Sequence, residues 1–112
     1  MSIDNLQASQ RILHTPHGDV LGCSYRWPGG QYCAIHTERG IVGCGLYDCL
    51  TATRFGMAVA IARGTPQQPL VEPEDLLVAI IAEVSEAAAA MGIVAGMTGN
   101  DALRQLLKGT TS

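Results

Sequence analysis

Three short strand patterns separated by tight turns limit the folds open to this chain more than any other feature. Residues 19–27 alternate between apolar residues and small or polar ones, which is typical of a half-buried β-strand. Strand patterns return at 31–37 and 40–44, after the turn sequences Pro28-Gly29-Gly30 and Glu38-Arg39. Because connections this short join antiparallel neighbours, the first half of the chain predicts a β-meander.

The lengths of the turns predict which residues face each other in this meander. A two-residue turn at Glu38-Arg39 pairs Cys33 with Cys44. A three-residue turn at Pro28-Gly29-Gly30 pairs Tyr25 with Cys33. Since directly paired side chains share a face of the sheet, we expect one core face and one opposite face. The expected core face carries Leu21, Cys23, Tyr25, Trp27, Cys33, Ile35, Val42 and Cys44, and the opposite face carries His14, Ser24, Arg26, Tyr32, Ala34 and His36.

The second half of the chain predicts helices around one buried strand. A helix is expected over 46–54, and the apolar run 57–62 is typical of a strand buried on both faces. Apolar residues at helical spacing predict a long helix over 73–91. A last helix is expected over 99–108, with Thr98 as its N-cap. The predicted fold is α/β in the mixed α+β sense: an antiparallel meander extended by a further buried strand, with two or three helices packed on one face.

The composition indicates one domain that is partly covered by a second copy of itself. A chain of 112 residues suggests a single domain over 1–112, with an ordered core at about 11–108. Hydrophobic residues make up 47% of the chain and charged residues only 15%, against about 25% charged residues in ordinary domains. We therefore expect a homo-oligomer, most simply a two-fold dimer.

Charge and hydropathy argue against two classes of partner. The chain has seven Lys and Arg, which are not clustered, and a net charge of -3, so it lacks the basic stripe that nucleic acids require. The longest apolar stretch, 87–95, is too short to span a bilayer. The first residues lack the basic start and apolar core of a signal peptide. We expect a cytoplasmic protein whose four cysteines are free thiols.

The predicted strand-to-helix junction Gly43–Asp48 is the first candidate site. Cys44 is a candidate nucleophile, because a helix N-terminus lowers the pKa of a nearby thiol, and Asp48 is a candidate acid/base group. Gly43 and Gly45 would let a ligand approach the backbone closely. Each side chain also has a simpler role: Cys44 as a buried packing residue and Asp48 as a partner of the helix dipole.

A second candidate site precedes the last predicted helix. Gly96, Thr98 and Gly99 lead into its N-terminus, where free backbone N–H groups can bind an anion. The simpler reading is a tight turn capped by Thr98. The four cysteines and three histidines lack the paired close spacings of zinc sites. We therefore expect no metal site and no cofactor.

The order of the elements and two glycine-bearing stretches resemble a known family. The stretches are Cys44–Asp48 and Gly92–Leu103, with Glu74-Asp75-Leu76-Leu77 between them. Over residues 12–107 the chain is similar to the YunC-like family of small bacterial and archaeal proteins of unknown function. The resemblance implies a compact mixed α/β domain, but it implies no activity and gives no residue a catalytic role.

Three classes of function follow from these observations. The first is a small-ligand-binding or assembly protein that acts as a homo-oligomer. The alternative is an enzyme that uses Cys44 and Asp48 at the junction. The third is a scaffold stabilised by a metal, which the cysteine spacings disfavour.

Overall fold

A six-stranded sheet forms the frame of the computed structural model, which describes residues 3–108. The strands are β1 (Gln7–Thr15), β2 (Gly18–Trp27), β3 (Gly30–His36), β4 (Ile41–Gly43), β5 (Val59–Ala62) and β6 (Ile81–Val84). The helices are α1 (Cys49–Arg54), α2 (Pro73–Val78), α3 (Glu86–Ala90) and α4 (Gly99–Leu107), and a short 3-10 helix, η1, spans Ile3–Asn5. Residues 1–2 and 109–112 of the expected domain lie outside the described residues.

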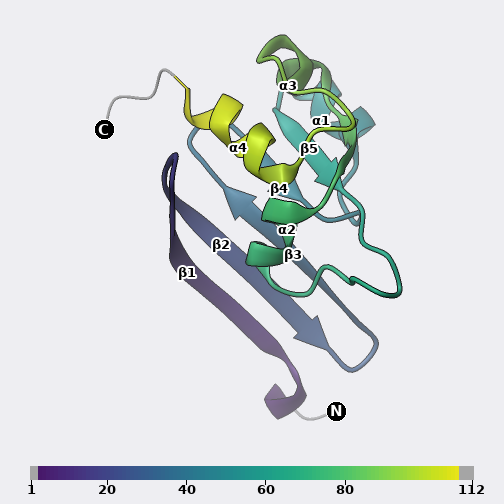
Figure 1. Cartoon of the computed structure of the whole chain (residues 1–112). Helices are drawn as coiled ribbons and strands as arrows, with labels where there is room; N and C mark the ends of the chain where they lie inside the picture. The colour runs from purple at the N-terminus through teal and green to yellow at the C-terminus, as the bar shows by residue number, and fades with distance from the viewer. Residues whose placement is uncertain (1–2, 109–112) are drawn as a thin grey trace.

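The strands lie in the sheet in the order in which they occur in the chain (Figure 1). All neighbouring pairs are antiparallel except β4 and β5, which run parallel. A parallel pair needs a crossover connection, and α1 supplies it. The predicted mixed α+β fold is confirmed: a meander extended by a buried strand, with β6 added at the far edge.

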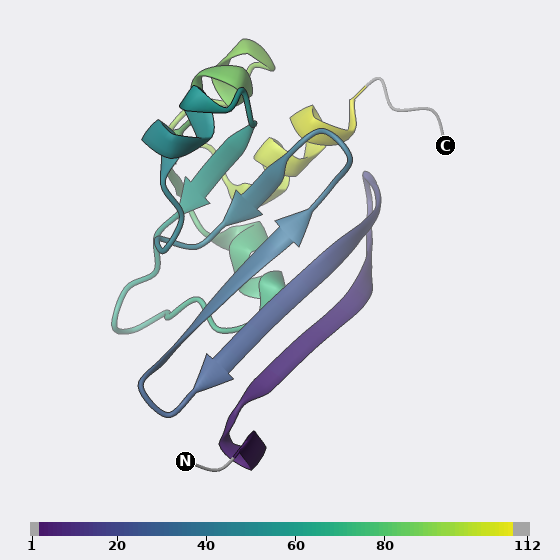
Figure 2. The ribbon, with the colours of Figure 1, turned by 180° about the vertical axis from the view of Figure 1, so that it is seen from behind.

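Helices lie on both sides of this sheet. On one side, which we call the covered face, Leu103 and Leu106 of α4 and Leu76 of α2 pack in the main core. On the other side, α1 packs its Ala52 on Val59 and Ile61 of β5. Beyond α1 no helix covers this side of the sheet over β1, β2 and β3 (Figure 2), and we call this area the open face. The helices that cover the core therefore share one face as predicted, while α1 lies opposite.

The predicted register of β3 and β4 is confirmed. Ile35 faces Val42, and one step further the Cys44 N–H donates to the Cys33 carbonyl at 3.2 Å. The two-residue turn at Glu38-Arg39 therefore sets this pairing. Cys33 and Cys44 share the covered face and belong to the main core.

The predicted register of β2 and β3 is wrong by one residue. Trp27 pairs with Gly30 and Cys23 with Ala34, so the turn contains two residues rather than three. A Cβ at Gly30 would lie 2.8 Å from the Trp27 ring, so this glycine is the strand residue over which the indole packs. A one-residue slip exchanges the two faces of a strand. Six residues of β2 therefore lie on the face opposite to the predicted one. Leu21, Cys23, Tyr25 and Trp27 lie on the open face, together with His14, Tyr32, Ala34 and His36. Ser24 and Arg26 lie on the covered face.

The long helix predicted over 73–91 is also wrong. The chain forms α2, then β6, then α3 across this segment. The middle of the segment is rich in β-branched residues, which favour strands, and β6 completes the sheet beside β5. The Ser85 hydroxyl then starts α3 by accepting the Ala88 N–H at 3.3 Å.

The remaining helices differ less from expectation. α1 begins at Cys49 rather than at residue 46, and Asp48 is its N-cap instead of a first-turn residue. α4 begins at Gly99 with Thr98 as its cap, as predicted. None of the helices within residues 3–108 is long and apolar enough to cross a membrane.

Candidate functional site

A large cavity lies beside α1, on the side of the sheet that bears the open face. Its volume is about 620 Å³, within the range of about 300–1,000 Å³ that small-molecule sites occupy. Three segments form its wall: the β3–β4 turn, α1 with the residues before it, and the entry to β5. We call it the α1 cavity; its lining residues are His36, Thr37, Glu38, Arg39, Gly40, Ile41, Tyr47, Asp48, Thr51, Ala52, Gly56, Met57, Ala58 and Val59.

Tyr47 is the aromatic wall of the α1 cavity. Its ring lies against Gly43, where a Cβ would come within 2.5 Å of the ring carbons, and its edge meets Tyr32 at a centroid distance of 6.4 Å. Burial, followed by the nearby Cys44 and Tyr32, raises the pKa of Tyr47 to about 12. The phenol is therefore neutral at physiological pH and keeps a proton to donate.

Asp48 lines the same cavity, and its carboxylate caps the N-terminus of α1. One carboxylate oxygen accepts the Leu50 N–H at 3.0 Å and the other accepts the Thr51 hydroxyl at 2.6 Å. These hydrogen bonds, the one from Thr51 first, lower the pKa of Asp48. Asp48 therefore presents a fixed negative charge at the cavity wall.

The β3–β4 turn supplies the polar rim of the cavity. The Thr37 hydroxyl donates to the Gly40 carbonyl at 2.7 Å, and the Arg39 guanidinium donates to the Lys108 carbonyl. Within residues 3–108, the side chains of His36 and Glu38 are exposed and make no hydrogen bond or ion pair. These two side chains are therefore free to meet a ligand.

Cys44 lies apart from the α1 cavity, on the covered face. Its residue is 6% exposed, and it does not line the cavity that Asp48 lines. The facing Cys33 thiol first, and backbone N–H groups such as that of Leu46, lower the pKa of Cys44 against the opposing effect of burial. The same pairing raises the pKa of Cys33.

Three of the four glycines in the predicted sites have local structural explanations. Gly43 makes room for the Tyr47 ring, whereas a Cβ at Gly45 would meet nothing within 4 Å. A Cβ at Gly99 would lie 1.7 Å from the Leu76 carbonyl oxygen, and Gly96 has a φ of +101°. The structure thus assigns packing or backbone roles to these positions, apart from Gly45.

In the second predicted site, the backbone N–H groups of Gly96 and Gly99 are engaged. Gly96 donates to the Ile81 carbonyl at 2.8 Å and Gly99 to the Ala79 carbonyl at 2.9 Å. The Thr98 hydroxyl accepts the Asp101 N–H at 3.1 Å. The turn before α4 is therefore a closed backbone corner that links the helix to α2 and β6.

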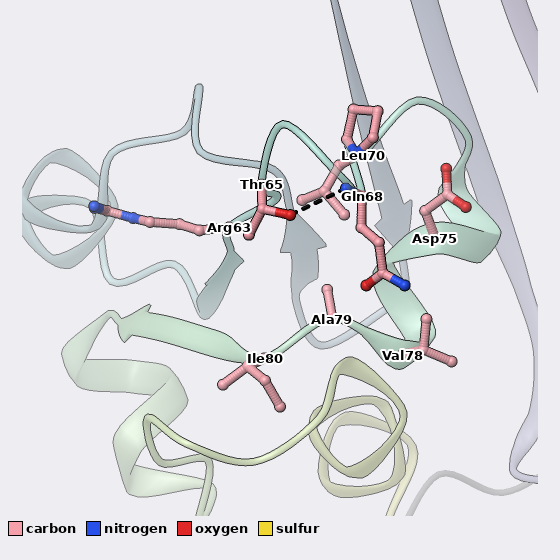
Figure 3. Close-up of a pocket in the computed structure, with 9 residues that line it drawn as sticks. Arg63, Thr65, Gln68, Leu70, Asp75, Val78, Ala79 and Ile80 are labelled. Atoms are coloured by element: carbon pink, nitrogen blue, oxygen red, sulfur yellow. Dashed lines mark hydrogen bonds between the residues drawn. The ribbon is translucent and has the colours of Figure 1, made fainter.

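A second hollow, of about 470 Å³, lies under the loop between β5 and α2 (Figure 3). Its polar groups mostly serve the loop itself. The Gln68 N–H donates to the Thr65 hydroxyl at 3.0 Å, the Asp75 carboxylate accepts the N–H groups of Val71 and Glu72, and Arg63 pairs with Glu83 at 3.0 Å. Because these groups are already paired, we take the α1 cavity as the candidate site.

Comparison with known proteins places the chain in a family. Residues 43–106 match the model of a domain of unknown function, DUF1805. The chain belongs to the DUF1805 family. The matched segment starts at the junction before α1 and includes Tyr47, Asp48 and the entry to β5.

The fold of this DUF1805 protein is similar to a solved structure. A crystal structure of TA1206, a protein of unknown function from Thermoplasma acidophilum, matches with a TM-score of 0.78 and 16% sequence identity. The match covers 95% of this chain and 99% of that one, and at this identity it shows a shared fold alone. No curated protein matches the chain.

Sequence reasoning found one wall of the α1 cavity and missed the others. The junction brought Tyr47 and Asp48 into consideration, whereas His36, Glu38 and Met57 were not recognised as neighbours of that junction. The signal that could have found them is the helix between two strand patterns, because a strand–helix–strand unit predicts parallel pairing of β4 and β5. No group of three or more His, Cys, Asp or Glu side chains within the described part of this DUF1805 protein could hold a metal ion.

Proposed function

We propose that this DUF1805 protein binds a small molecule in the α1 cavity and acts as a homodimer. The observation that carries the proposal is the cavity itself, whose volume of about 620 Å³ suits a small ligand. Its lining combines apolar residues, among them Ile41, Tyr47 and Val59, with the polar rim from the β3–β4 turn. A ligand with an apolar or aromatic body and one hydrogen-bonding end fits this arrangement.

The polar rim supports a neutral, hydrogen-bonding ligand end. His36 and Glu38 offer side chains without other partners in the described residues, and Tyr47 keeps its phenolic proton. Asp48 and Arg39 are of opposite charge, and both are held by the protein's own hydrogen bonds. The cavity therefore has no excess of positive charge that would favour an anionic ligand.

Exposed apolar residues support the second part of the proposal, the homodimer. Ile12 is 63% exposed and, with Leu21, lines a groove on the open face that shares His36 and Glu38 with the α1 cavity. Further exposed apolar residues lie on the open face or around α1: Trp27, Leu46, Leu50, Phe55 and Met57. Apolar areas of this kind mark interaction surfaces, and a second copy is the simplest partner in a closed two-fold contact.

Two further parts of the proposal rest on the sequence. We infer a cytoplasmic location because the four cysteines are free thiols, as expected in a reducing compartment. We also infer that YunC-like proteins are relatives of this chain, on the two glycine-bearing stretches that resemble them.

Ligand binding is tested with a matched pair of variants on α1. Thr51 lines the cavity and its neighbour Leu50 does not, and both residues are exposed. Thr51→Trp should fill the cavity, whereas Leu50→Trp should leave it open. In a ligand-observed NMR screen of neutral aromatic fragments, we expect hits that bind the unmodified protein and Leu50→Trp but not Thr51→Trp. Hits that bind all three proteins equally, or no hits at all, would contradict the proposed site.

The homodimer is tested by light scattering on the purified protein. We expect a mass near twice the 11.8 kDa of one chain at micromolar concentration. Ile12→Glu should give the monomer, because it places a charge on the open face. Val78→Glu is the control, since Val78 is 76% exposed on α2 and should leave the dimer intact. A mass near 11.8 kDa for the unmodified protein would refute this part.

A second candidate function is an enzyme that uses Cys44. The lowered pKa of this thiol favours it. Asp48 would not act together with Cys44 in such an enzyme, because Asp48 lines the α1 cavity and Cys44 does not. Cys44→Ala would remove the activity of such an enzyme and leave fragment binding in the α1 cavity unchanged.

A further inference from the structure

The covered face carries a thiol pair that ligand binding in the α1 cavity does not use. Cys33 and Cys44 lie directly opposite each other, one step beyond the Ala34–Gly43 pair of β3 and β4. Directly opposed residues of antiparallel strands have Cα atoms about 4.5–5.5 Å apart. A disulfide requires about 4.4–6.8 Å. The backbone therefore already holds both cysteines at a separation that a disulfide can bridge.

The two thiols differ in access and in pKa. Cys33 is 0% exposed, and Cys44 is 6% exposed. The facing Cys33 thiol first, and the backbone N–H of Leu46 among others, lower the pKa of Cys44, whereas the pKa of Cys33 is raised. A lowered pKa favours the thiolate, which is the nucleophilic form of cysteine. The more accessible thiol is thus the one prepared to attack, and the fully buried thiol stands beside it.

We propose that Cys33 and Cys44 form a reversible redox site, which a low-molecular-weight disulfide oxidises to a Cys33–Cys44 disulfide. This site goes beyond the proposed function and does not depend on ligand binding or on dimer formation. It also differs from a hydrolytic use of Cys44, because the second thiol is required.

The reaction proceeds by two thiol–disulfide exchanges. The Cys44 thiolate attacks one sulfur of the oxidant, which forms a mixed disulfide and releases the first thiolate. Cys33 then gives up its proton and attacks the Cys44 sulfur, which releases the second thiolate. The two protein sulfurs lose two electrons, the oxidant is reduced to two thiols, and the protons of Cys33 and Cys44 end on those thiols.

The other two cysteines are suitable internal controls. Cys23 lies on the open face opposite Ala34, and Cys49 lies in α1, where its thiol contacts the Val59 carbonyl oxygen at 3.8 Å. Neither residue faces another cysteine in the sheet register. Burial raises the pKa of both thiols, so neither should compete with Cys44 for the oxidant.

The test is oxidation of the reduced protein in glutathione buffers of increasing oxidised fraction, followed by alkylation and tryptic peptide mapping. The Cys49→Ser variant is used, because Cys44 and Cys49 fall in the same tryptic peptide, 40–54. We expect a single cross-linked species that joins peptide 40–54 to peptide 27–39, which contains Cys33. Reduction with excess thiol should restore both alkylated peptides.

Further variants distinguish the proposed site from unspecific oxidation. Cys33→Ala should retain glutathione on Cys44, because the resolving thiol is missing, whereas Cys23→Ser should cross-link as fully as the unmodified protein. The near-UV circular dichroism of each variant checks that it is folded. The proposal fails if the oxidised protein links Cys23, if Cys44 keeps glutathione while Cys33 is intact, or if both thiols remain reduced in buffers that oxidise small dithiols.

Discussion

Gly99→Ala should destabilise the protein strongly, because the backbones of α2 and α4 meet at this residue. The added Cβ would lie 1.7 Å from the Leu76 carbonyl oxygen and 2.8 Å from its carbon. Contacts of Cβ atoms under 3.0 Å essentially do not occur, so the two backbones would have to separate by about 1 Å or more. No side chain could rotate to relieve this clash.

The loss of stability follows from the core contacts and the hydrogen bond that would break if α2 and α4 moved apart. Leu76, Leu103 and Leu106 are fully buried in the main core, and overpacking of a tight core costs about 1–3 kcal/mol, sometimes more. The Gly99 N–H would also lose its bond to the Ala79 carbonyl at 2.9 Å, which adds about 1 kcal/mol. We expect a loss of about 2–4 kcal/mol in the free energy of unfolding.

Urea unfolding followed by the fluorescence of Trp27, the single tryptophan, measures this loss. With a slope of about 1–3 kcal/mol per molar urea, the midpoint should fall by about 0.7–4 M. Gly45→Ala is the matched control, since a Cβ there meets nothing within 4 Å, and its midpoint should stay level or rise slightly. Equal midpoints for Gly99→Ala and the unmodified protein would refute the close approach of α2 and α4.

Three further measurements test other features. Ser85→Ala should lower the unfolding free energy, measured by urea titration, by about 2–4 kcal/mol. The reason is that the buried hydroxyl bonds to the Val59 N–H at 2.9 Å, to the Met57 carbonyl at 2.7 Å and to the first turn of α3. A loss as small as that of an ordinary helix cap would show that the bonds to Val59 and Met57 contribute little. Asp48 has a lowered folded-state pKa, so the stability from its charge is present above the unfolded-state pKa of about 3.9 and is lost as the pH falls through the lowered folded-state pKa. The urea midpoint of Asp48→Asn should lie below that of the unmodified protein at neutral pH, and the gap should narrow as the pH falls through this range; an unchanged gap would show that the charge is not responsible. Oxidation of Cys33 and Cys44 should raise the unfolding free energy by about 3 kcal/mol, the value for closing a loop of about 12 residues. Urea unfolding of the oxidised and of the reduced protein checks this, and a lower midpoint after oxidation would indicate a strained disulfide instead.

Local signals predicted the elements in which turn, cap and pattern agree. The Glu38-Arg39 turn gave the correct register of β3 and β4, because two turn residues leave one pairing that keeps Ile35 and Val42 in the core. The cap at Thr98 located α4. Where the local signal was ambiguous the prediction was wrong: Pro28-Gly29-Gly30 allows a turn of two or three residues, and packing of Trp27 over Gly30 decides between them.

The segment after α2 shows a different limit. Its apolar residues recur at helical spacing, but the β5 edge needed a partner strand, and β6 supplies it. The buried hydroxyl of Ser85, which bonds to Val59 across the sheet, marks where the strand must end. Such tertiary requirements override local periodicity, and they cannot be read from the segment alone.

Only the part of the candidate site that lies in one continuous segment of the chain could be predicted. The junction before α1 contains Tyr47 and Asp48, and both line the α1 cavity. The rim residues His36 and Glu38 come from a turn that precedes the junction, and Met57 follows α1. Their convergence depends on the parallel pairing of β4 and β5, which only the order of strand, helix and strand over a longer stretch indicates, not the junction itself.

The order of the strands bears on how the protein is made in the cell. Because each strand pairs with the one synthesised just before it, pairing can begin as the chain leaves the ribosome, without waiting for distant segments. The exception is the main core, whose cover includes α4, the last helix of the described chain. Until α4 is synthesised, Ile35 and Val42 have only part of their final cover. A nascent chain that stalls before residue 99 would therefore present a paired sheet with a bare apolar face, which is the kind of surface that chaperones bind.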